Sequence, residues 1–352
     1  MVIQHCRRMI KPLTVTDFIA LGQPVLDVRS PGEYSESHIP GSFNLPLLDD
    51  ADRAKVGKTY KDLGQEAAIA LGYQLVNPLR EAMLSKANTF SQDKTISLYC
   101  ARGGLRSAKM AAFLSENGFQ VYVLKGGYKS YRRHILAEIS QFTNIVIVAG
   151  HTGCGKTEVL QEMEKLGAQV LDLESLAHHK GSAFGGLGHP EQPSTSQFQN
   201  RIFEVLRRFS PALPLWVENE SVKIGRVCIP EELWENMCNA GGYELVLPVD
   251  ERVKFILEGY GKFDTESLVM CIRNLARRLG DEDMRRLCQM TAERDLEPVV
   301  RRLIAYYDKS YDHHVSGRDC QIFVKMPFEK VKPLEIAAFL LSCHSGKSTN
   351  NQ

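Results

Sequence analysis

The stretch Ile145-Val-Ile-Val-Ala-Gly150-His-Thr-Gly-Cys-Gly-Lys156-Thr157 decides the fold of the second half of the chain. Its apolar start is typical of a buried strand, and the residues that follow match the phosphate-binding pattern G-x4-G-K-T. An amphipathic helix to Leu166 and a short strand at 169–173 come next, so the stretch opens a βαβ unit. Backbone N–H groups of such a loop wrap phosphate oxygens. The predicted phosphate-binding residues are Gly150, Thr152, Gly153, Gly155, Lys156 and Thr157.

Two side chains of this P-loop have separate expected roles. Lys156 is expected to reach the terminal phosphate, and Thr157 to ligate Mg²⁺. Asp172, at the end of the next strand, is the candidate second acid for Mg²⁺; the alternative interpretation is an acid that caps a turn. The loop fits ATP or any other diphosphate, and no tightly bound organic cofactor is expected.

The first half of the chain is predicted to have the same class of fold. The ranges 24–29, 95–100 and 120–124 have the composition of strands, and 107–117 has that of a helix, which indicates a parallel α/β sheet. The range 49–88 has a mostly helical pattern and is interpreted as an insertion. The predicted organisation is a parallel-sheet domain at 1–135, a connecting helix at 136–142, a P-loop domain at 143–345 with an Arg-rich helical region at 250–311, and a flexible tail at 346–352.

A cysteine stands between a predicted strand and a predicted helix, in Cys100-Ala-Arg-Gly-Gly-Leu-Arg106-Ser107. Successive N–H groups and the helix start favour an anion there, and Arg106 adds a permanent cation, so the Cys100 thiol is expected to be acidic, nucleophilic and open to solvent. The alternative is a buried cysteine that ends a strand. The candidate catalytic residues are Cys100 and Arg106, and the candidate binding residues are Arg102, Gly103, Gly104 and Ser107.

Composition limits the setting and the partners. The chain has 352 residues, 43 Lys+Arg against 42 Asp+Glu, and nine cysteines without a C-x-x-C pair, which argues against a disulfide framework or a zinc site. Its start lacks an apolar signal core, so a cytoplasmic protein without membrane contact is expected. With a net charge of +1, a nucleic acid would have to dock on local basic patches. The candidates are Arg132, Arg133, Arg273, Arg277 and Arg278, of which Arg273 and Arg277 are predicted to share one helix face; a solvated helix with interleaved acids is the alternative.

Three separated segments resemble a rhodanese domain: Asp27-Val-Arg-Ser-Pro-Gly-Glu-Tyr34, His38-Ile-Pro-Gly41 with Asn44, and the cysteine loop. The resemblance implies a chalcogen carried on Cys100. The spacing Cys-x5-Arg is one residue longer than the usual sulfur-carrying pattern and is similar to that of rhodanese-like phosphatases, which suggests a larger guest such as selenium or a phosphorylated chalcogen donor. Asp27 and Arg29 are interpreted as a structural ion pair in preference to a catalytic pair.

The order of the two domains, with three further strings, closely resembles the bacterial tRNA 2-selenouridine synthase family. Those strings are Asp172-Leu-Glu-Ser-Leu-Ala-His-His-Lys-Gly-Ser-Ala-Phe-Gly185, Gln192-Pro-Ser194 with Gln197-Phe198, and Glu218-Asn-Glu-Ser221 with Ile224-Gly-Arg226. The resemblance implies an enzyme that alkylates wobble 2-thiouridine in the tRNA anticodon loop with geranyl diphosphate, and then replaces the S-geranyl group with selenium from a supply of selenophosphate. Cys100 would hold selenium as a perselenide or assist attack at C2 of the base. The oligomeric state stays open.

From the charges, we assign geranylation to the P-loop domain and selenium insertion to the cysteine loop. The expected second-site residues are Asp172, Glu174, His178, His179, Lys180 and Glu218. An aromatic side chain is also expected to hold the splayed wobble base, with Phe184, Tyr306 and Tyr307 as candidates.

Two other classes of function compete with this hypothesis. One is a cysteine-dependent phosphatase fused to a small-molecule P-loop kinase, although Tyr99 stands where such phosphatases usually have His. The other is a tRNA-binding scaffold without activity. A binding module would need neither the intact cysteine loop nor Lys156 and Thr157, so the transferase is favoured.

Overall fold

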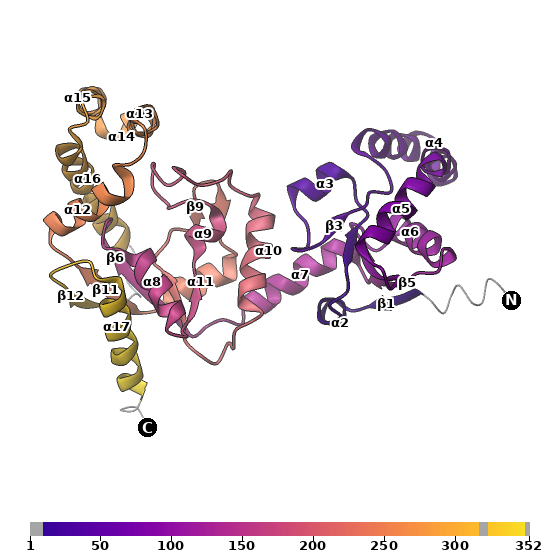
Figure 1. Ribbon diagram of the computed structural model, residues 1–352, viewed down its shortest axis with the longest axis horizontal. Coiled ribbons are helices and arrows are strands. Elements are labelled where there is room, and N and C mark those ends of the chain that lie inside the picture. Colours follow the sequence, from indigo (N-terminus) through magenta and orange to yellow (C-terminus); the bar gives the residue numbers. More distant parts are fainter. Residues whose placement is uncertain (1–9, 317–322, 349–352) are drawn as a thin grey trace. The chain divides into compact units, whose positions relative to one another are not determined.

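The computed structural model describes residues 10–316 and 323–348 and divides into two compact units, Met1–Ala137 and Glu138–Gln352 (Figure 1). We call them the N-terminal and C-terminal units. Each is built on a five-stranded sheet in which every strand pairs in parallel with its neighbours, so the predicted α/β class is confirmed for both. Among the described residues, no helix has the length and apolar character needed to cross a membrane.

The sheet of the N-terminal unit has the order β1-β5-β4-β2-β3. Its central strand β4 is fully buried from Ile96 to Tyr99 because both its neighbours and the covering helices exclude water. Cys100 follows β4 directly, at the carboxyl edge of the sheet where parallel α/β folds gather their binding loops. The strands are β1 (Ile10–Leu13), β2 (Val25–Asp27), β3 (Phe43–Asn44), β4 (Thr95–Tyr99) and β5 (Gln120–Leu124).

The predicted insertion is helical. α4 (Asp50–Val76) contains a kink at Gly64, whose φ of 86° is open to glycine and strained for other residues. A 3₁₀ turn, η1 (Asn77–Leu79), joins α4 to α5 (Arg80–Phe90). The remaining helices are α2 (Val15–Ala20), α3 (Pro31–Glu36), α6 (Leu105–Glu116) and α7 (Gly127–Ile139). Helix α7 begins before the connecting helix predicted at 136–142 and overlaps that range only as far as Ile139.

The C-terminal unit has the strand order β12-β11-β6-β8-β7. Strand β6 (Ile145–Gly150) is central and wholly buried, and its core includes Val148, Leu160 and Leu245. The other strands are β7 (Gln169–Leu171), β8 (Leu215–Glu218), β11 (Gly242–Val246) and β12 (Phe323–Pro327), with a small antiparallel pair, β9 (Lys223–Ile224) and β10 (Val227–Cys228). The helices are α8 (Lys156–Lys165), α9 (Leu173–Ala177), α10 (Thr195–Leu206), α11 (Glu231–Asn239), α12 (Val249–Tyr260), α13 (Thr265–Asn274), α14 (Ala276–Leu279), α15 (Asp281–Ala292), α16 (Leu296–Ser316) and α17 (Pro333–Ser348).

Two predictions about this unit are wrong. Arg273 and Arg277 do not share a helix, because α13 ends at Asn274 and α14 begins at Ala276. The buried Leu275 between them donates its N–H to the Ile272 carbonyl, a tighter turn than that of an α-helix. The tail predicted at 346–352 is helical as far as Ser348, since α17 packs on the core through Ile336 and other apolar residues, and 349–352 lie outside the described residues.

Candidate functional site

The cysteine loop is held in place by the turn that precedes α7. The carbonyl of Cys100 accepts the N–H of Tyr128, and the carbonyl of Ala101 accepts the N–H of Lys129. Gly127, with φ of 61°, makes the approach possible, because a Cβ there would lie 2.3 Å from the Cys100 carbonyl oxygen. The Gly126–Gly127 pair is a functional feature that the sequence analysis missed; its signal was two glycines directly after a predicted strand.

The Cys100 thiol lies within a set of hydrogen-bond donors. Burial by itself raises its pKa, but the Ser107 hydroxyl and the backbone N–H groups of Arg102, Ser107 and Gly104 outweigh burial and lower the pKa from the ordinary thiol value. The Sγ–Oγ distance to Ser107 is 3.2 Å. The thiol is therefore acidic, as predicted, and the largest favourable contributions come from hydrogen bonds.

The prediction that the thiol is open to solvent is wrong. Cys100 is 2% exposed and belongs to the hydrophobic core, while Arg102, Gly103 and Gly104 of the loop above it are exposed. The physical reason is that the thiol sits at the end of a central strand and points beneath the loop whose amides surround it. Chemistry at this thiol requires that the loop uncover it.

Arg106 does not stand as an uncompensated cation in the loop. Its guanidinium donates to both carboxylate oxygens of Glu33, at 2.6 and 3.2 Å, and Arg53 reaches the same carboxylate at 2.9 Å. Burial raises the pKa of Glu33, but Arg106 in particular outweighs burial and holds that pKa at about 2. Glu33 was part of the resemblance but had no predicted role.

Asp27 and Arg29 form a structural ion pair, in agreement with the favoured interpretation. The Arg29 guanidinium is paired with the Asp27 carboxylate at 2.5 Å, and both side chains are buried. It also donates to the Ser37 carbonyl at 2.6 Å and lies 4.2 Å from the ring centroid of Tyr128. The pair ties β2 to the chain before β3.

The P-loop joins β6 to α8 as predicted. Gly150, Gly153 and Gly155 all have positive φ, and a Cβ at Gly153 would lie 3.0 Å from the Arg252 carbonyl oxygen. The buried Arg252 side chain in turn donates to the Thr152 carbonyl at 2.9 Å and is paired with Asp308. The loop therefore has a fixed path, with a buried guanidinium fastening its back.

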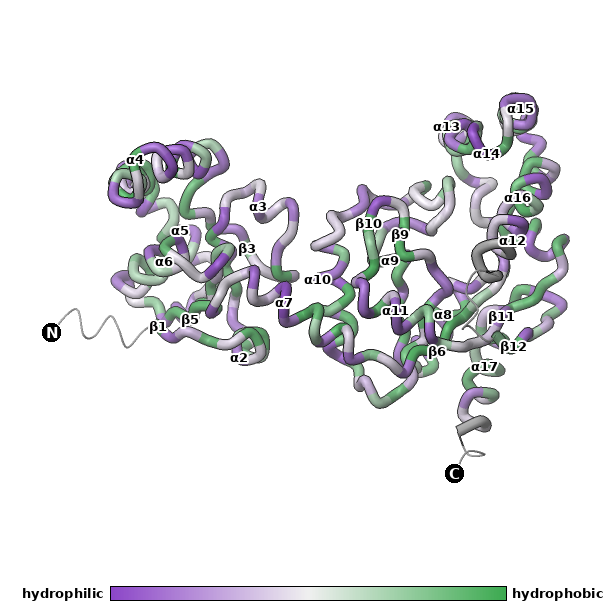
Figure 2. Tube along the Cα trace, turned by 180° about the vertical axis from the view of Figure 1, so that it is seen from behind, coloured by the Kyte–Doolittle hydropathy of each residue, from purple (hydrophilic) through white to green (hydrophobic). Residues whose placement is uncertain are grey.

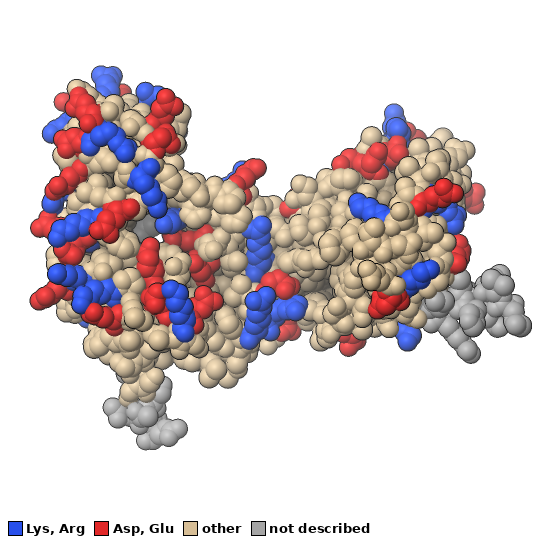
Figure 3. Space-filling model, in the orientation of Figure 1, with Lys and Arg blue, Asp and Glu red and all other residues tan. Residues whose placement is uncertain are grey.

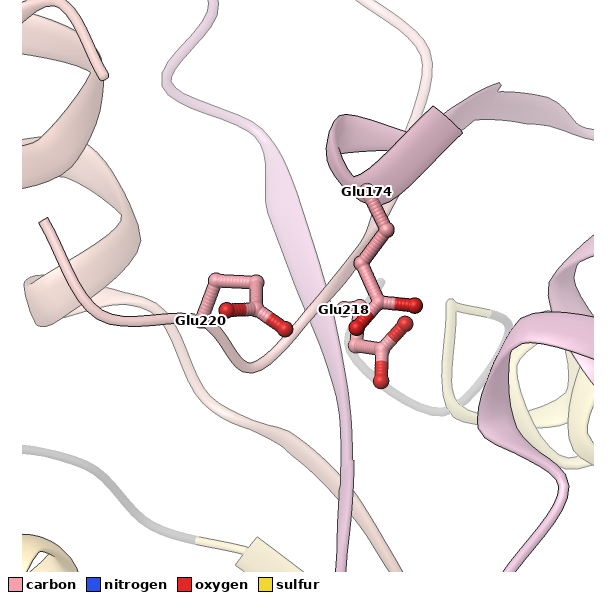
Figure 4. A group of neighbouring side chains, drawn as sticks. All are labelled: Glu174, Glu218 and Glu220. Carbon is pink, nitrogen blue, oxygen red and sulfur yellow. The ribbon is translucent and has the colours of Figure 1, made fainter. Parts of the chain in front are cut away.

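Thr157 meets carboxylates from two other elements. Its hydroxyl lies 3.1 Å from Glu174 Oε2 and 3.3 Å from Glu218 Oε2, and Glu220 completes a group whose oxygens lie within 4.8 Å of one another. Figure 4 shows the three carboxylates turned toward one another. Oxygen donors of this kind fit a hard cation such as Mg²⁺.

The acid beside Thr157 is not Asp172. Asp172 caps α9, where its carboxylate accepts the Ser175 N–H at 2.8 Å. The strand order explains the difference: β8, which ends in Glu218, is the neighbour of β6, whereas β7, which precedes Asp172, is one strand further away. Glu174 and Glu218 were among the expected second-site residues, and Glu220 was missed because its role follows from the sheet order.

Crowded carboxylates change the electrostatics of the site. Burial, with the carboxylates of Glu218 and Glu220, raises the pKa of Glu174 to about 10. Burial and Glu218 raise the pKa of Glu220 to about 8. Burial alone would lower the pKa of Lys156, but Glu218, 3.4 Å from its Nζ, and Glu174 outweigh burial and raise it. A bound cation, alone or together with its phosphate ligand, would reduce the repulsion among these carboxylates.

Two adjoining cavities open at the P-loop. The phosphate cavity has a volume of about 650 Å³ and is lined by the loop, the three glutamates, Lys180 and Arg278 among others. The second, which we call the apolar cavity, has about 80 Å³ and lies among α12, α13, α15 and α16. Thr152, Ser182, Ile256, Tyr260 and Tyr307 line both, so the two cavities lie side by side.

His178 and His179, which were predicted to face a diphosphate, are not among the described residues that line the phosphate cavity. His178 contacts the Glu191 carbonyl through Nδ1 and the Arg201 guanidinium through Nε2, at 3.0 and 2.9 Å. The His179 ring packs against Gly185, and burial lowers its pKa. Lys180, the third residue of that string, does line the cavity.

The arginines proposed for tRNA lie in different settings. All three arginines of α13 and α14 are exposed, and of these Arg278 lines the phosphate cavity whereas Arg273 and Arg277 are not among its lining residues. Figure 3 shows Lys and Arg interleaved with Asp and Glu over α13, α14 and α15, which favours a solvated surface there. On α7, Arg133 is exposed and Arg132 is half-buried. The candidate stacking residues Phe184, Tyr306 and Tyr307 pack in the hydrophobic cluster around the apolar cavity.

Comparisons with known proteins agree with both halves of the chain. A model of the tRNA 2-selenouridine synthase AAA domain matches residues 143–335, and a model of the rhodanese-like domain matches residues 14–134. A tRNA 2-selenouridine synthase of Hahella chejuensis is 36% identical over 84% of this chain and 86% of its own length. One of Shewanella woodyi is 31% identical over 91% and 95%. Among solved structures, a rhodanese-related protein of Thermoplasma volcanium is 22% identical, covers 35% of this chain and 92% of its own, and has a TM-score of 0.23.

Proposed function

The chain belongs to the tRNA 2-selenouridine synthase family, and from that premise we propose that it converts wobble 2-thiouridine to 2-selenouridine through an S-geranyl intermediate. Its proposed substrates are geranyl diphosphate, selenophosphate and the anticodon loop of tRNA, in the cytoplasm. The relatives reported above match this chain over both domains and are named tRNA 2-selenouridine synthase, which favours this function over a phosphatase fused to a kinase and over a scaffold without activity.

The observation that carries the geranyl proposal is that the two cavities share lining residues beside the P-loop. A prenyl diphosphate has an anionic head and an apolar tail, and here a phosphate cavity adjoins a cavity lined by side chains such as Ile272, Leu303 and Ile304. A volume of about 80 Å³ holds roughly six water-sized groups, which suits part of a ten-carbon chain. A nucleotide would instead need polar partners for its base and ribose.

In the first step, the thione sulfur of the base attacks C1 of the geranyl group. The C1–O bond breaks, the diphosphate leaves with the bonding electrons, and the base loses its N3 proton. The P-loop amides and Lys156 stabilise the charge that grows on the departing diphosphate. Thr157, Glu174 and Glu218 would hold Mg²⁺, which when bound neutralises part of that charge.

In the second step, selenium replaces the S-geranyl group at C2. The Cys100 thiolate attacks C2 and expels geranylthiolate; the selenium of selenophosphate then displaces the cysteine, and water releases phosphate from selenium. This sequence needs no oxidant, whereas a perselenide formed from selenophosphate would need one. Loop amides from Arg102 to Ser107 supply donors beside the reacting sulfur.

The test is incubation with 2-thiouridine anticodon RNA, geranyl diphosphate and selenophosphate, followed by mass analysis of the nucleosides. The expected result is an S-geranyl nucleoside that forms first and is then converted to 2-selenouridine. Formation of 2-selenouridine at the same rate without geranyl diphosphate would overturn the proposed intermediate.

A further inference from the structure

A cavity of about 730 Å³ lies beside the cysteine loop in the N-terminal unit. Both halves of α4, on either side of the kink at Gly64, line it, together with Leu105, Arg106 and Lys109 from the start of α6. We call it the α4 groove. It reaches the cysteine loop through Leu105 and Arg106, so an occupant of the groove would lie next to the selenium-insertion site.

The charged side chains that line the α4 groove all have one sign. They are Arg53, Lys58, Lys61, Arg106 and Lys109, and no Asp or Glu is among the described lining residues. Arg53 and Arg106 share Glu33, and Lys109 donates to the Tyr73 hydroxyl at 2.6 Å. Lys58 and Lys61 lie on the exposed surface of α4. The excess of cations is confined to the lining of the groove, because Asp50, Asp52, Asp62 and Glu66 also lie on α4 but outside that lining.

Exposed aromatic rings stand among these cations. Tyr60 is 57% exposed and Tyr73 is 44% exposed, and the Lys109 ammonium lies 5.0 Å from the Tyr73 ring centroid. Figure 2 shows hydrophilic and hydrophobic residues alternating along α4. Cations that follow a backbone, beside rings that can stack on bases, are the combination that single-stranded nucleic acid binds.

Folding alone does not account for α4. Of its 27 residues only Ala68 is buried, so the helix adds little to the hydrophobic core of the unit. An exposed surface that combines apolar, aromatic and basic residues next to a reactive loop points to a ligand. An acidic protein partner would use the cations but has no particular need for exposed tyrosine rings.

We propose that the α4 groove binds the single-stranded anticodon segment of tRNA, with phosphates on Lys58 and Lys61 and a base stacked on Tyr60. The proposal rests on the proposed function, since it gives the modified nucleotide a place beside the cysteine loop. It moves the principal RNA contact of this unit from the arginines of α7 to the insertion.

The experiment is fluorescence anisotropy of a labelled anticodon stem-loop with the full chain, at several salt concentrations. Tyr60→Ala is expected to weaken binding about tenfold through lost stacking. The double variant Lys58→Ala/Lys61→Ala should reduce the slope of log affinity against log salt by about 1.4. The matched control is Lys55→Ala/Lys86→Ala, which removes the same charge from the same unit outside the groove and should leave the slope unchanged.

Unchanged affinity and slope in both groove variants would overturn the proposal. So would variants that bind RNA normally but lose selenium insertion only when selenium comes from a donor protein, because that result assigns the groove to a protein. Binding is measured without turnover, so a wild-type chain that binds RNA through the groove but forms no modified nucleoside would refute the proposed function and leave the groove intact.

Discussion

Filling the apolar cavity should separate recognition of the prenyl chain from recognition of diphosphate. Val300 lines the cavity and is only partly buried, so Val300→Phe can extend into the open space without displacing the core. The larger side chain adds four carbon atoms, which would occupy about four of the roughly six water-sized positions. At about 0.8 kcal/mol for each buried methylene, the geranyl chain loses about 3 kcal/mol, or roughly 100-fold in kcat/KM.

The assay is formation of S-geranyl-2-thiouridine in RNA, with inhibition by inorganic diphosphate measured in parallel. Because Val300 is not among the described residues that line the phosphate cavity, the inhibition constant of diphosphate should stay within about twofold of the wild-type value. Val249→Phe, at an exposed position of α12 outside the cavity, is the control. An unchanged kcat/KM for geranyl diphosphate in Val300→Phe would refute the reasoning, and equal losses for geranyl diphosphate and diphosphate would show distortion of the whole site.

Three further outcomes follow from the same structure. Gly127→Ala places a Cβ against the cysteine loop and should reduce selenium insertion about 100-fold while geranylation persists. The control Gly22→Ala, with similar φ but open space around it, should leave both activities unchanged, and mass analysis of the nucleosides measures the two activities. Glu33→Gln removes the ion pair between Glu33 and Arg106. The pKa of Glu33 in the folded protein, about 2, lies below the ordinary 4.5, so the pair stabilises the fold above about pH 4.5 and this contribution is lost as the pH falls toward 2. Denaturant unfolding should therefore show that the variant loses about 1–2 kcal/mol of unfolding free energy at pH 7, allowing for solvent screening, and none near pH 2. Arg252→Ala breaks a buried ion pair behind the P-loop and should cost about 3–5 kcal/mol in unfolding free energy and raise KM for geranyl diphosphate; an unchanged KM would mean that Arg252 does not position the loop.

Local patterns were enough to predict the two sheets and both anion loops. The strands at 95–100 and 120–124 and the P-loop each follow from a short run of residues, because a buried strand followed by a glycine turn has few alternative structures. The acidic helix cap at Asp172 was also one of the two interpretations available from the sequence.

What depends on strand order could not be predicted in this way. Glu218 reaches Thr157 because β8, far along the chain, inserts between β6 and β7, and no periodicity within one strand encodes its neighbours. The burial of Cys100 and the pairing of Arg106 with Glu33 have the same origin: each depends on residues distant in sequence that the sheet brings together.

The central claim is that two anion sites in one chain carry out consecutive reactions on one base, and the most direct test supplies each step separately. Wild type, Cys100→Ala and Lys156→Ala are given either 2-thiouridine RNA with geranyl diphosphate or synthetic S-geranyl-2-thiouridine RNA with selenophosphate, and the nucleosides are analysed by mass. We predict that Cys100→Ala forms the S-geranyl product but inserts no selenium, and that Lys156→Ala inserts selenium into the synthetic intermediate but cannot form it. The reverse pattern, or loss of both steps in folded protein of either variant, would contradict the claim.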